Sequence, residues 1–187
     1  KGICPAALGT KDQQPAAYSP RTGLMYSPLN HVCMTYEPVE SKYIAGQPWV
    51  GATLTMFPGP DGVMGGFAAY EPMTNKKVWY NKEKFSAWGG ALATASDLVF
   101  YGTLDRWFKA VDAKTGKELW KHQVGSGVIG NAFTYGHKGK QYVGVLSGIG
   151  GWAGVAMNLG MTNPTDALGA AGGYAELTKY NAAPGGG

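Results

Sequence analysis

Two segments of the chain, 67–79 and 108–120, repeat the same pattern at a spacing of 41 residues. Aligned without a gap, each segment begins with Phe, carries Ala at its third position and ends with Trp. Each copy has the pattern of a strand, a polar turn and a second strand. The repeat therefore predicts two equivalent antiparallel units, in which the terminal Trp79 and Trp120 each pack between sheets.

The period of the repeat indicates the architecture. A spacing near 40 residues, with about four strands in each unit, is typical of β-propeller blades. At that spacing, a chain of 187 residues provides roughly four blades or fewer. We therefore expect residues 1–187 to form one segment of a larger propeller domain, incomplete at both ends and built from four-stranded antiparallel sheets.

The rest of the chain favours the same all-β class. Glycine accounts for 30 of the 187 residues and only 15% are charged, which is typical of short strands joined by tight turns. Residues 18–28 predict a hairpin with its tip at 21–23, and 97–103 and 141–148 predict further strands. Short helices are expected only within 162–182, where Ala and Leu recur.

Charge and hydropathy exclude several classes of partner. The net charge is +4, but no basic run is longer than Lys76-Lys77, whereas nucleic-acid-binding surfaces cluster their basic side chains. No stretch approaches the roughly 18 apolar residues of a membrane span. We expect neither nucleic acid nor a membrane span, and no signal peptide opens the chain.

The residues able to carry chemistry are few. No common catalytic or nucleotide-binding motif occurs, and the three histidines are widely separated. Cys4 and Cys33 could form a disulfide or remain two buried thiols, and neither lies in a zinc-binding pattern.

Two glycine-flanked tryptophans, Trp88 in 86–91 and Trp152 in 148–154, could lie against a flat ligand. Alternatively, each indole could simply pack over glycines at a bend of the sheet. On the residues alone, both interpretations stay open.

Four longer motifs, 50–60, 88–95, 98–105 and 150–155, closely resemble the C-terminal third of the large subunits of methanol dehydrogenases that depend on pyrroloquinoline quinone (PQQ). They occur in the same order, and the resemblance covers essentially the whole chain. The family fold is an eight-bladed propeller, with PQQ near its axis and tryptophan-docking motifs in its blades. The resemblance thus implies that this chain supplies several of those blades.

The resemblance also implies a cofactor site. Trp88, Gly151 and Trp152 match positions that contact PQQ, and Asp12 stands where calcium-type enzymes place an Asn near the quinone. The segments 11–15 and 153–158 are more similar to the lanthanide-type enzymes than to the calcium type, so the metal is expected to be a lanthanide, with calcium as the alternative.

Further implications concern the compartment and the rest of the molecule. Cys4 and Cys33 match a family disulfide, which fits an oxidising periplasm. The family's metal ligands and catalytic Asp lie upstream of the matching region, so this segment is expected to contain neither and to be inactive alone.

The whole protein would oxidise methanol and other short primary alcohols to the aldehyde and pass electrons to a cytochrome c, and the full subunit is expected to form a homodimer. Two alternatives remain: a non-catalytic propeller scaffold, or a PQQ enzyme acting on larger alcohols.

Overall fold

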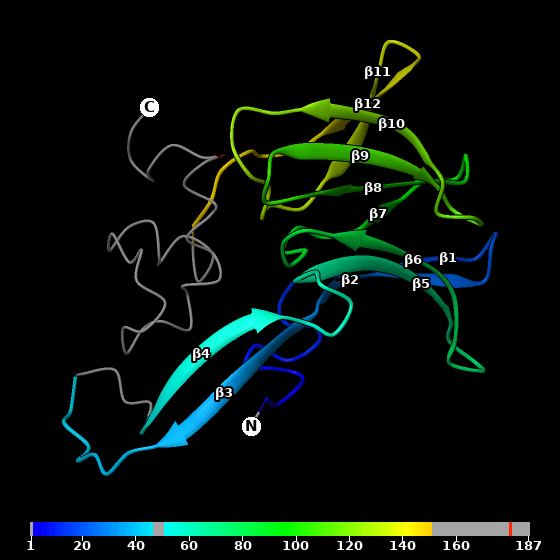
Figure 1. Ribbon diagram of the computed structural model, residues 1–187. Helices are drawn as coiled ribbons and strands as arrows, with labels where there is room; N and C mark the ends of the chain where they lie inside the picture. Colours follow the sequence, from blue (N-terminus) through cyan, green and yellow to red (C-terminus); the bar gives the residue numbers. More distant parts are fainter. Residues whose placement is uncertain (1, 47–50, 151–179, 181–187) are drawn as a thin grey trace.

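The computed structural model describes residues 2–46, 51–150 and 180, and every regular element in these ranges is a β-strand (Figure 1). No helix in the described ranges is long and apolar enough to cross a membrane. The short helices expected within 162–182 fall outside the described residues, except Tyr180, which lies in a turn. The strands form two four-stranded sheets and two separate hairpins.

The first sheet has the strand order β1-β2-β5-β6, with antiparallel neighbours. Its strands are β1 (Ala17–Ser19), β2 (Leu24–Asn30), β5 (Gly65–Glu71) and β6 (Lys76–Glu83). The predicted hairpin over 18–28 is confirmed, because β1 pairs with β2 across a turn that contains Gly23 at φ 70°. The first copy of the repeat forms β5, β6 and the turn between them.

The second sheet has the order β10-β9-β8-β7 and is also antiparallel. Its strands are β7 (Leu92–Ala93), β8 (Leu98–Gly102), β9 (Trp107–Asp112) and β10 (Glu118–Gln123). The strand predicted over 97–103 is confirmed as β8. The second copy of the repeat forms β9 and β10.

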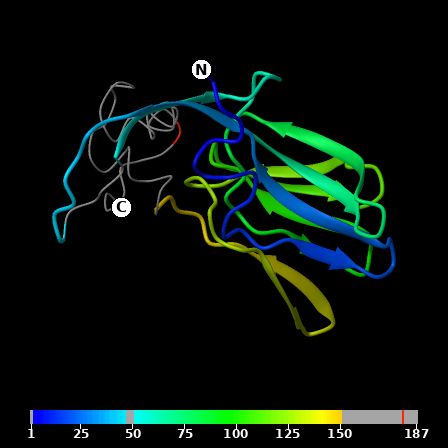
Figure 2. The same ribbon diagram turned by 90° about the horizontal axis from the view of Figure 1, so that it is seen from below.

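The two hairpins lie apart from these sheets. β3 (Val32–Pro38) and β4 (Ala52–Pro58) form a long arm that leaves the body of the molecule, as two views at right angles show (Figures 1 and 2). β11 (Phe133–His137) pairs with β12 (Lys140–Gly144) across a tight turn at 138–139. The strand expected over 141–148 therefore ends at Gly144, and the following residues lie outside strands.

The sheets share one apolar core. Phe67 of β5 stacks on Tyr101 of β8 with ring centroids 4.0 Å apart, and Trp79 and Val111 pack in the same cluster. A second cluster forms where the base of the arm meets the sheets. Its buried members are Ala6, Val32, Met56, Met64, Phe85, Trp88 and Leu104.

The two repeat tryptophans occupy equivalent positions in register but differ in burial. Ala69 lies opposite Trp79, and Ala110 lies opposite Trp120. Trp79 is only 9% exposed, as predicted, but Trp120 is 49% exposed, so the prediction that both pack between sheets is wrong for Trp120. The reason is geometric: Trp79 faces the second sheet, whereas no further four-stranded sheet in the described ranges covers Trp120 on β10.

Candidate cofactor-binding site

Trp88 lies in the turn that follows β6 and is 3% exposed. Its indole packs in the apolar cluster with Phe85 and Leu104. The Nε1–H group is buried and has no hydrogen-bond partner in the described part of the chain. A buried donor left unpaired costs about 1–3 kcal/mol, so this N–H is a candidate donor to a bound ligand.

Asp12 is exposed on the loop before β1, and the structure links this loop to the Trp88 turn. The Asp12 backbone N–H donates to Gln14 Oε1 at 3.0 Å, and Gln14 Nε2 donates to the carbonyl of Ala87 at 3.0 Å. One buried side chain therefore connects Asp12 with Ala87, the residue before Trp88. Sequence reasoning missed Gln14, because a single glutamine carries no motif.

The glycines beside Trp88 allow close packing of protein segments. A Cβ added to Gly90 would overlap the side chains of Asn131 and Pro15, and one added to Gly89 would lie 3.3 Å from the carbonyl oxygen of Gly130. The space at these two glycines is thus filled by the protein itself. This observation supports close packing of protein segments as the role of Gly89 and Gly90.

Gly151 and Trp152 lie outside the described residues, so a pocket shared by Trp88 and Trp152 stays a prediction. Ile149 lies two positions before Gly151 and is described. Ile149 packs against the cluster that contains Trp88. The described chain therefore lies beside this cluster at Ile149.

Tyr180 packs beside the same cluster, and sequence reasoning also missed it. Its ring meets Phe85 edge-on with centroids 5.9 Å apart, and its hydroxyl accepts a hydrogen bond from Lys84 Nζ at 3.3 Å. Arg106 Nη1 donates to the Tyr180 carbonyl at 3.4 Å. A lone tyrosine 92 residues after Trp88 in the sequence gives no signal of this contact.

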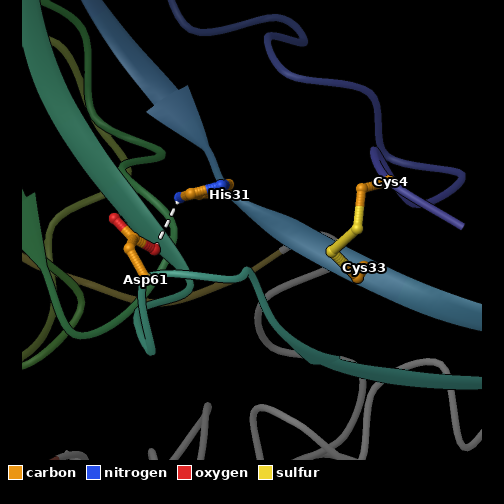
Figure 3. The surroundings of a disulfide bond; sticks show 4 residues. All are labelled: Cys4, His31, Cys33 and Asp61. Carbon is orange, nitrogen blue, oxygen red and sulfur yellow. Dashed lines mark ion pairs between the residues drawn. A yellow bond between two sulfur atoms is a disulfide. The ribbon is translucent and has the colours of Figure 1, made fainter. Parts of the chain in front are cut away.

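The disulfide implied by the resemblance is confirmed. Cys4 and Cys33 are bonded, which ties the N-terminal segment to β3 (Figure 3). The backbones of Ile3 and Met34 add two hydrogen bonds, of 2.7 and 2.9 Å, at the same place. The segment that leads to Asp12 is therefore anchored at its start.

The histidines do not converge on one site. His31 Nδ1 lies 2.8 Å from Asp61 Oδ1, without hydrogen-bond geometry (Figure 3). His122 stacks on Trp120, and His137 is exposed at the end of β11. Within the described ranges, no group of three or more His, Cys, Asp or Glu side chains is placed to hold a metal ion.

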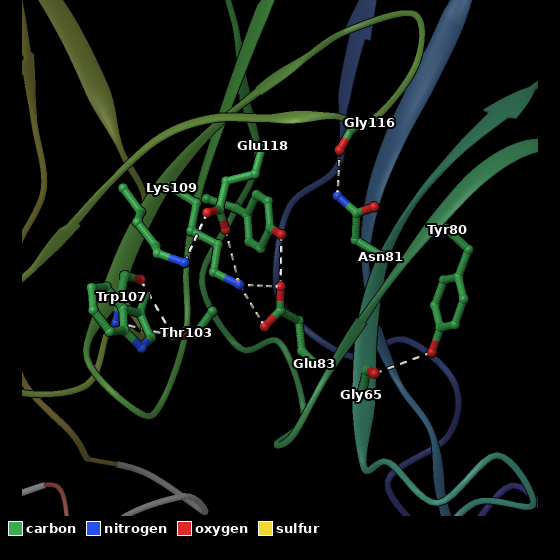
Figure 4. A network of polar contacts seen from close by, with 11 residues as sticks. Gly65, Tyr80, Asn81, Glu83, Thr103, Trp107, Lys109, Gly116 and Glu118 are labelled. Carbon is green, nitrogen blue, oxygen red and sulfur yellow. Dashed lines mark hydrogen bonds and ion pairs between the residues drawn. The ribbon is translucent and has the colours of Figure 1, made fainter.

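A buried ion pair joins the two sheets away from this site (Figure 4). Lys109 Nζ on β9 lies 2.8 and 2.9 Å from the carboxylate oxygens of Glu83 on β6. The Tyr101 hydroxyl donates to Glu83 Oε1 at 2.7 Å. Burial, with the Glu83 carboxylate beside it, raises the pKa of the Tyr101 phenol well above its ordinary value. The phenol therefore remains a hydrogen-bond donor, and the network fixes one sheet against the other.

Comparison with known proteins agrees with this architecture. Residues 62–143 match the family described as the glucose/ethanol/alcohol dehydrogenase PQQ β-propeller domain. A solved structure titled europium-containing methanol dehydrogenase superposes with a TM-score of 0.88 at 48% identity, covering 98% of this chain and 33% of that one. The prediction of an all-β propeller fold is confirmed.

Sequence relatives define the family. The lanthanide-dependent methanol dehydrogenase of Methylorubrum extorquens is 64% identical over 96% of this chain and 30% of its own length. The methanol dehydrogenase [cytochrome c] subunit 1 of Methylobacterium organophilum is 46% identical over 100% of this chain and 31% of its own. This chain belongs to the PQQ-dependent quinoprotein alcohol dehydrogenases, and it spans about 30% of the length of these relatives.

Proposed function

We propose that this chain is the C-terminal part of a periplasmic PQQ-dependent methanol dehydrogenase of the lanthanide type. The observation that carries the proposal is the 64% identity to a lanthanide-dependent methanol dehydrogenase over 96% of this chain. The whole protein would oxidise methanol and other short primary alcohols to the aldehyde. The disulfide between Cys4 and Cys33 supports an oxidising compartment.

The described residues fit a flat, oxygen-rich cofactor on one side. Trp88 offers an aromatic ring and a buried N–H that has no hydrogen-bond partner among the described residues, which suits a quinone or carboxylate oxygen. Together with Gly151, Trp152 and Asp12, it would hold one side of PQQ. When bound, PQQ accepts the two electrons that the alcohol loses.

The chain's own residues would bind and orient the cofactor. The cluster of Trp88, Phe85 and Leu104 excludes water from the indole, which strengthens any hydrogen bond that its N–H donates. Asp12 places a carboxylate on the adjoining loop. We propose that the ligands of the metal ion, a lanthanide or alternatively calcium, and the catalytic base belong to the part of the protein upstream of this chain.

The proposed partners follow from the same relationship. A relative 46% identical to this chain is named as a cytochrome c-linked subunit, which supports a cytochrome c as the electron acceptor. We also propose that the full subunit forms a homodimer and that the remaining blades come from the same polypeptide.

The full-length protein tests this proposal directly. Purified with PQQ and either La³⁺ or Ca²⁺, it should retain the quinone and reduce an artificial dye, then a cytochrome c, when methanol is added. Higher kcat/KM for a larger alcohol than for methanol would favour the larger-alcohol enzyme. A folded full-length protein that retains no PQQ would favour the scaffold and overturn the proposal.

A further inference from the structure

We propose that Gln14 is a positioning residue, which sets the Asp12 loop against the Trp88 turn and thereby controls how tightly the protein retains PQQ. The inference rests on the proposed function. It concerns a side chain that touches neither the cofactor nor the reacting atoms in our account. Gln14 acts through two other residues, Asp12 and Trp88.

The side chain of Gln14 is 1% exposed, and both ends of its amide are used. Oε1 accepts a hydrogen bond from the backbone N–H of Asp12 at 3.0 Å. Nε2 donates to the carbonyl of Ala87 at 3.0 Å and to Asn30 Oδ1 at 3.4 Å. A primary amide is one of the few side-chain groups that can accept at one end and donate twice at the other.

These bonds fix the two peptide units that matter to the site. The carbonyl of Ala87 and the N–H of Trp88 belong to one planar peptide group, so holding the carbonyl orients the backbone that carries the indole. The N–H of Asp12 is held in the same way at the other end. One side chain therefore fixes the orientation of the Asp12 backbone relative to the Trp88 backbone.

The surroundings of Gln14 keep its amide in place. Asn30, which is 2% exposed, donates its backbone N–H to the carbonyl of Thr10 at 2.7 Å. The backbone N–H of Ala91 donates to the carbonyl of Pro15 at 3.0 Å. The loop is thus attached to the sheet on both sides of Gln14, and the amide bridges the gap between these attachments.

The adjacent glutamine provides a matched control. Gln13 has the same side chain and differs by one position, but it is exposed. A change at Gln13 alters composition and loop sequence in the same way without removing a buried bridge. Any effect found at Gln14 alone therefore reports the bridge.

The test uses the full-length protein and three variants. Gln14→Leu keeps a similar volume and removes every hydrogen bond, Gln14→Glu keeps the acceptor for Asp12 and loses both donors, and Gln13→Leu is the control. The measurements are the dissociation constant and absorption spectrum of PQQ, with thermal unfolding of the PQQ-free protein alongside.

We expect Gln14→Leu to weaken PQQ binding by roughly ten- to a hundredfold, by analogy with the range found when groups that orient metal-coordinating side chains are removed. Gln14→Glu should also weaken PQQ binding, because a carboxylate oxygen would replace the donor that faces the Ala87 carbonyl and Asn30 Oδ1. Gln13→Leu should bind PQQ as the unmodified protein does. The quinone absorption should shift in the Gln14 variants, because the indole no longer meets the ring system in the same orientation.

Two results would overturn the inference. In one, a folded Gln14→Leu protein binds PQQ within twofold of the unmodified protein, even if its unfolding temperature falls, because the role would then be structural. In the other, Gln14→Leu does not fold, and a folded Gln14→Glu protein binds PQQ normally. If the unmodified full-length protein binds no PQQ, the proposed function fails first, and this inference fails with it.

Discussion

The two copies of the repeat form the same local structure but meet different surroundings. Phe67 lies opposite Asn81 in the first sheet, and Phe108 lies opposite His122 in the second, so strand register is preserved residue for residue. Burial is not preserved, because Trp79 faces a neighbouring sheet and Trp120 does not. Local sequence thus determines the register of each hairpin, while the presence of a neighbouring sheet determines whether its tryptophan is buried.

The contact made by Trp79 shows what such a neighbour supplies. Trp79 Nε1 donates to the carbonyl of Ala113 at 3.0 Å, and the indole lies over Gly116. Asn81 Nδ2 donates to the carbonyl of Gly116 at 2.7 Å (Figure 4). The same turn that connects β9 and β10 therefore receives both side chains from β6.

The largest expected effect comes from removing that tryptophan. In the 187-residue chain, Trp79→Ala should lower the free energy of unfolding by about 3–5 kcal/mol, because it leaves a cavity and an unpaired carbonyl. The control Trp120→Ala should cost much less, since its indole is half exposed. Urea unfolding of both variants measures the difference. Equal losses of unfolding free energy in the two variants would show that the burial of Trp79 does not make it more stabilising than Trp120.

The second largest loss of stability is expected from a substitution at Gly116, in the turn that contacts Trp79. Gly116 has φ 73°, and a Cβ there would lie 2.6 Å from the Trp79 ring. Gly116→Ala should therefore cost about 2–4 kcal/mol, from left-handed backbone strain and from displacement of the indole.

Asn75 is the matched position in the first copy, with φ 56°. Asn75→Gly relieves the same backbone strain, so its free energy of unfolding should stay the same or rise slightly. Loss of stability at Asn75 as large as at Gly116 would contradict this account of the turn.

The network across the sheets should give a smaller change. The Tyr101 hydroxyl donates to the buried Glu83 carboxylate at 2.7 Å, and a hydrogen bond to a charged group contributes about 1.5–3 kcal/mol. Tyr101→Phe should reduce stability by that order. Tyr142→Phe, at a 41% exposed tyrosine on β12, is the control and should change stability by less than about 0.5 kcal/mol. Similar effects of both substitutions would exclude a contribution from the network.

Much of the fold could be predicted from the sequence because it depends on local patterns. The repeat, the turn residues and the alternation of apolar positions specify strand pairs over distances of a few residues. The residues alone left open both the cysteine pairing and the role of the glycine-flanked Trp88 and Trp152. Only the family resemblance implied the disulfide and the predicted contacts with PQQ. Local pattern and resemblance therefore contributed different parts of the prediction.

The remaining features depend on tertiary contacts that no local pattern encodes. Gln13 and Gln14 are identical in sequence terms, and only the folded loop buries one of them. Tyr180 reaches Phe85 across 95 positions of the chain. The exposure of Trp120 depends on whether another sheet lies beside it. In each case, the deciding partner is remote in sequence.

The smallest expected effect concerns pH and again distinguishes the two copies. In the second copy, Asp112 accepts hydrogen bonds from the Thr115 hydroxyl and from the backbone N–H groups of Thr115 and Lys114. These bonds hold the pKa of the Asp112 carboxyl below its ordinary value. A carboxyl whose pKa is lower in the folded state stabilises the protein above its unfolded pKa of about 3.9, and that stabilisation is lost as pH falls through the folded value.

Asp112→Asn should therefore lower the free energy of unfolding slightly at pH 7. It should also remove the share of the stability loss on acidification that comes from protonation of Asp112. The change in unfolding free energy should be small, because the side chain lies at an exposed turn. Added salt should reduce this change only slightly, because short hydrogen bonds rather than distant charges cause it. Glu71 occupies the matching turn of the first copy, where its Oε2 accepts a hydrogen bond from the Thr74 hydroxyl at 2.6 Å. Urea unfolding of Asp112→Asn and Glu71→Gln between pH 7 and pH 2.5 makes the comparison. If Asp112→Asn loses as much unfolding free energy on acidification as the unmodified protein does, other carboxyl groups cause that loss.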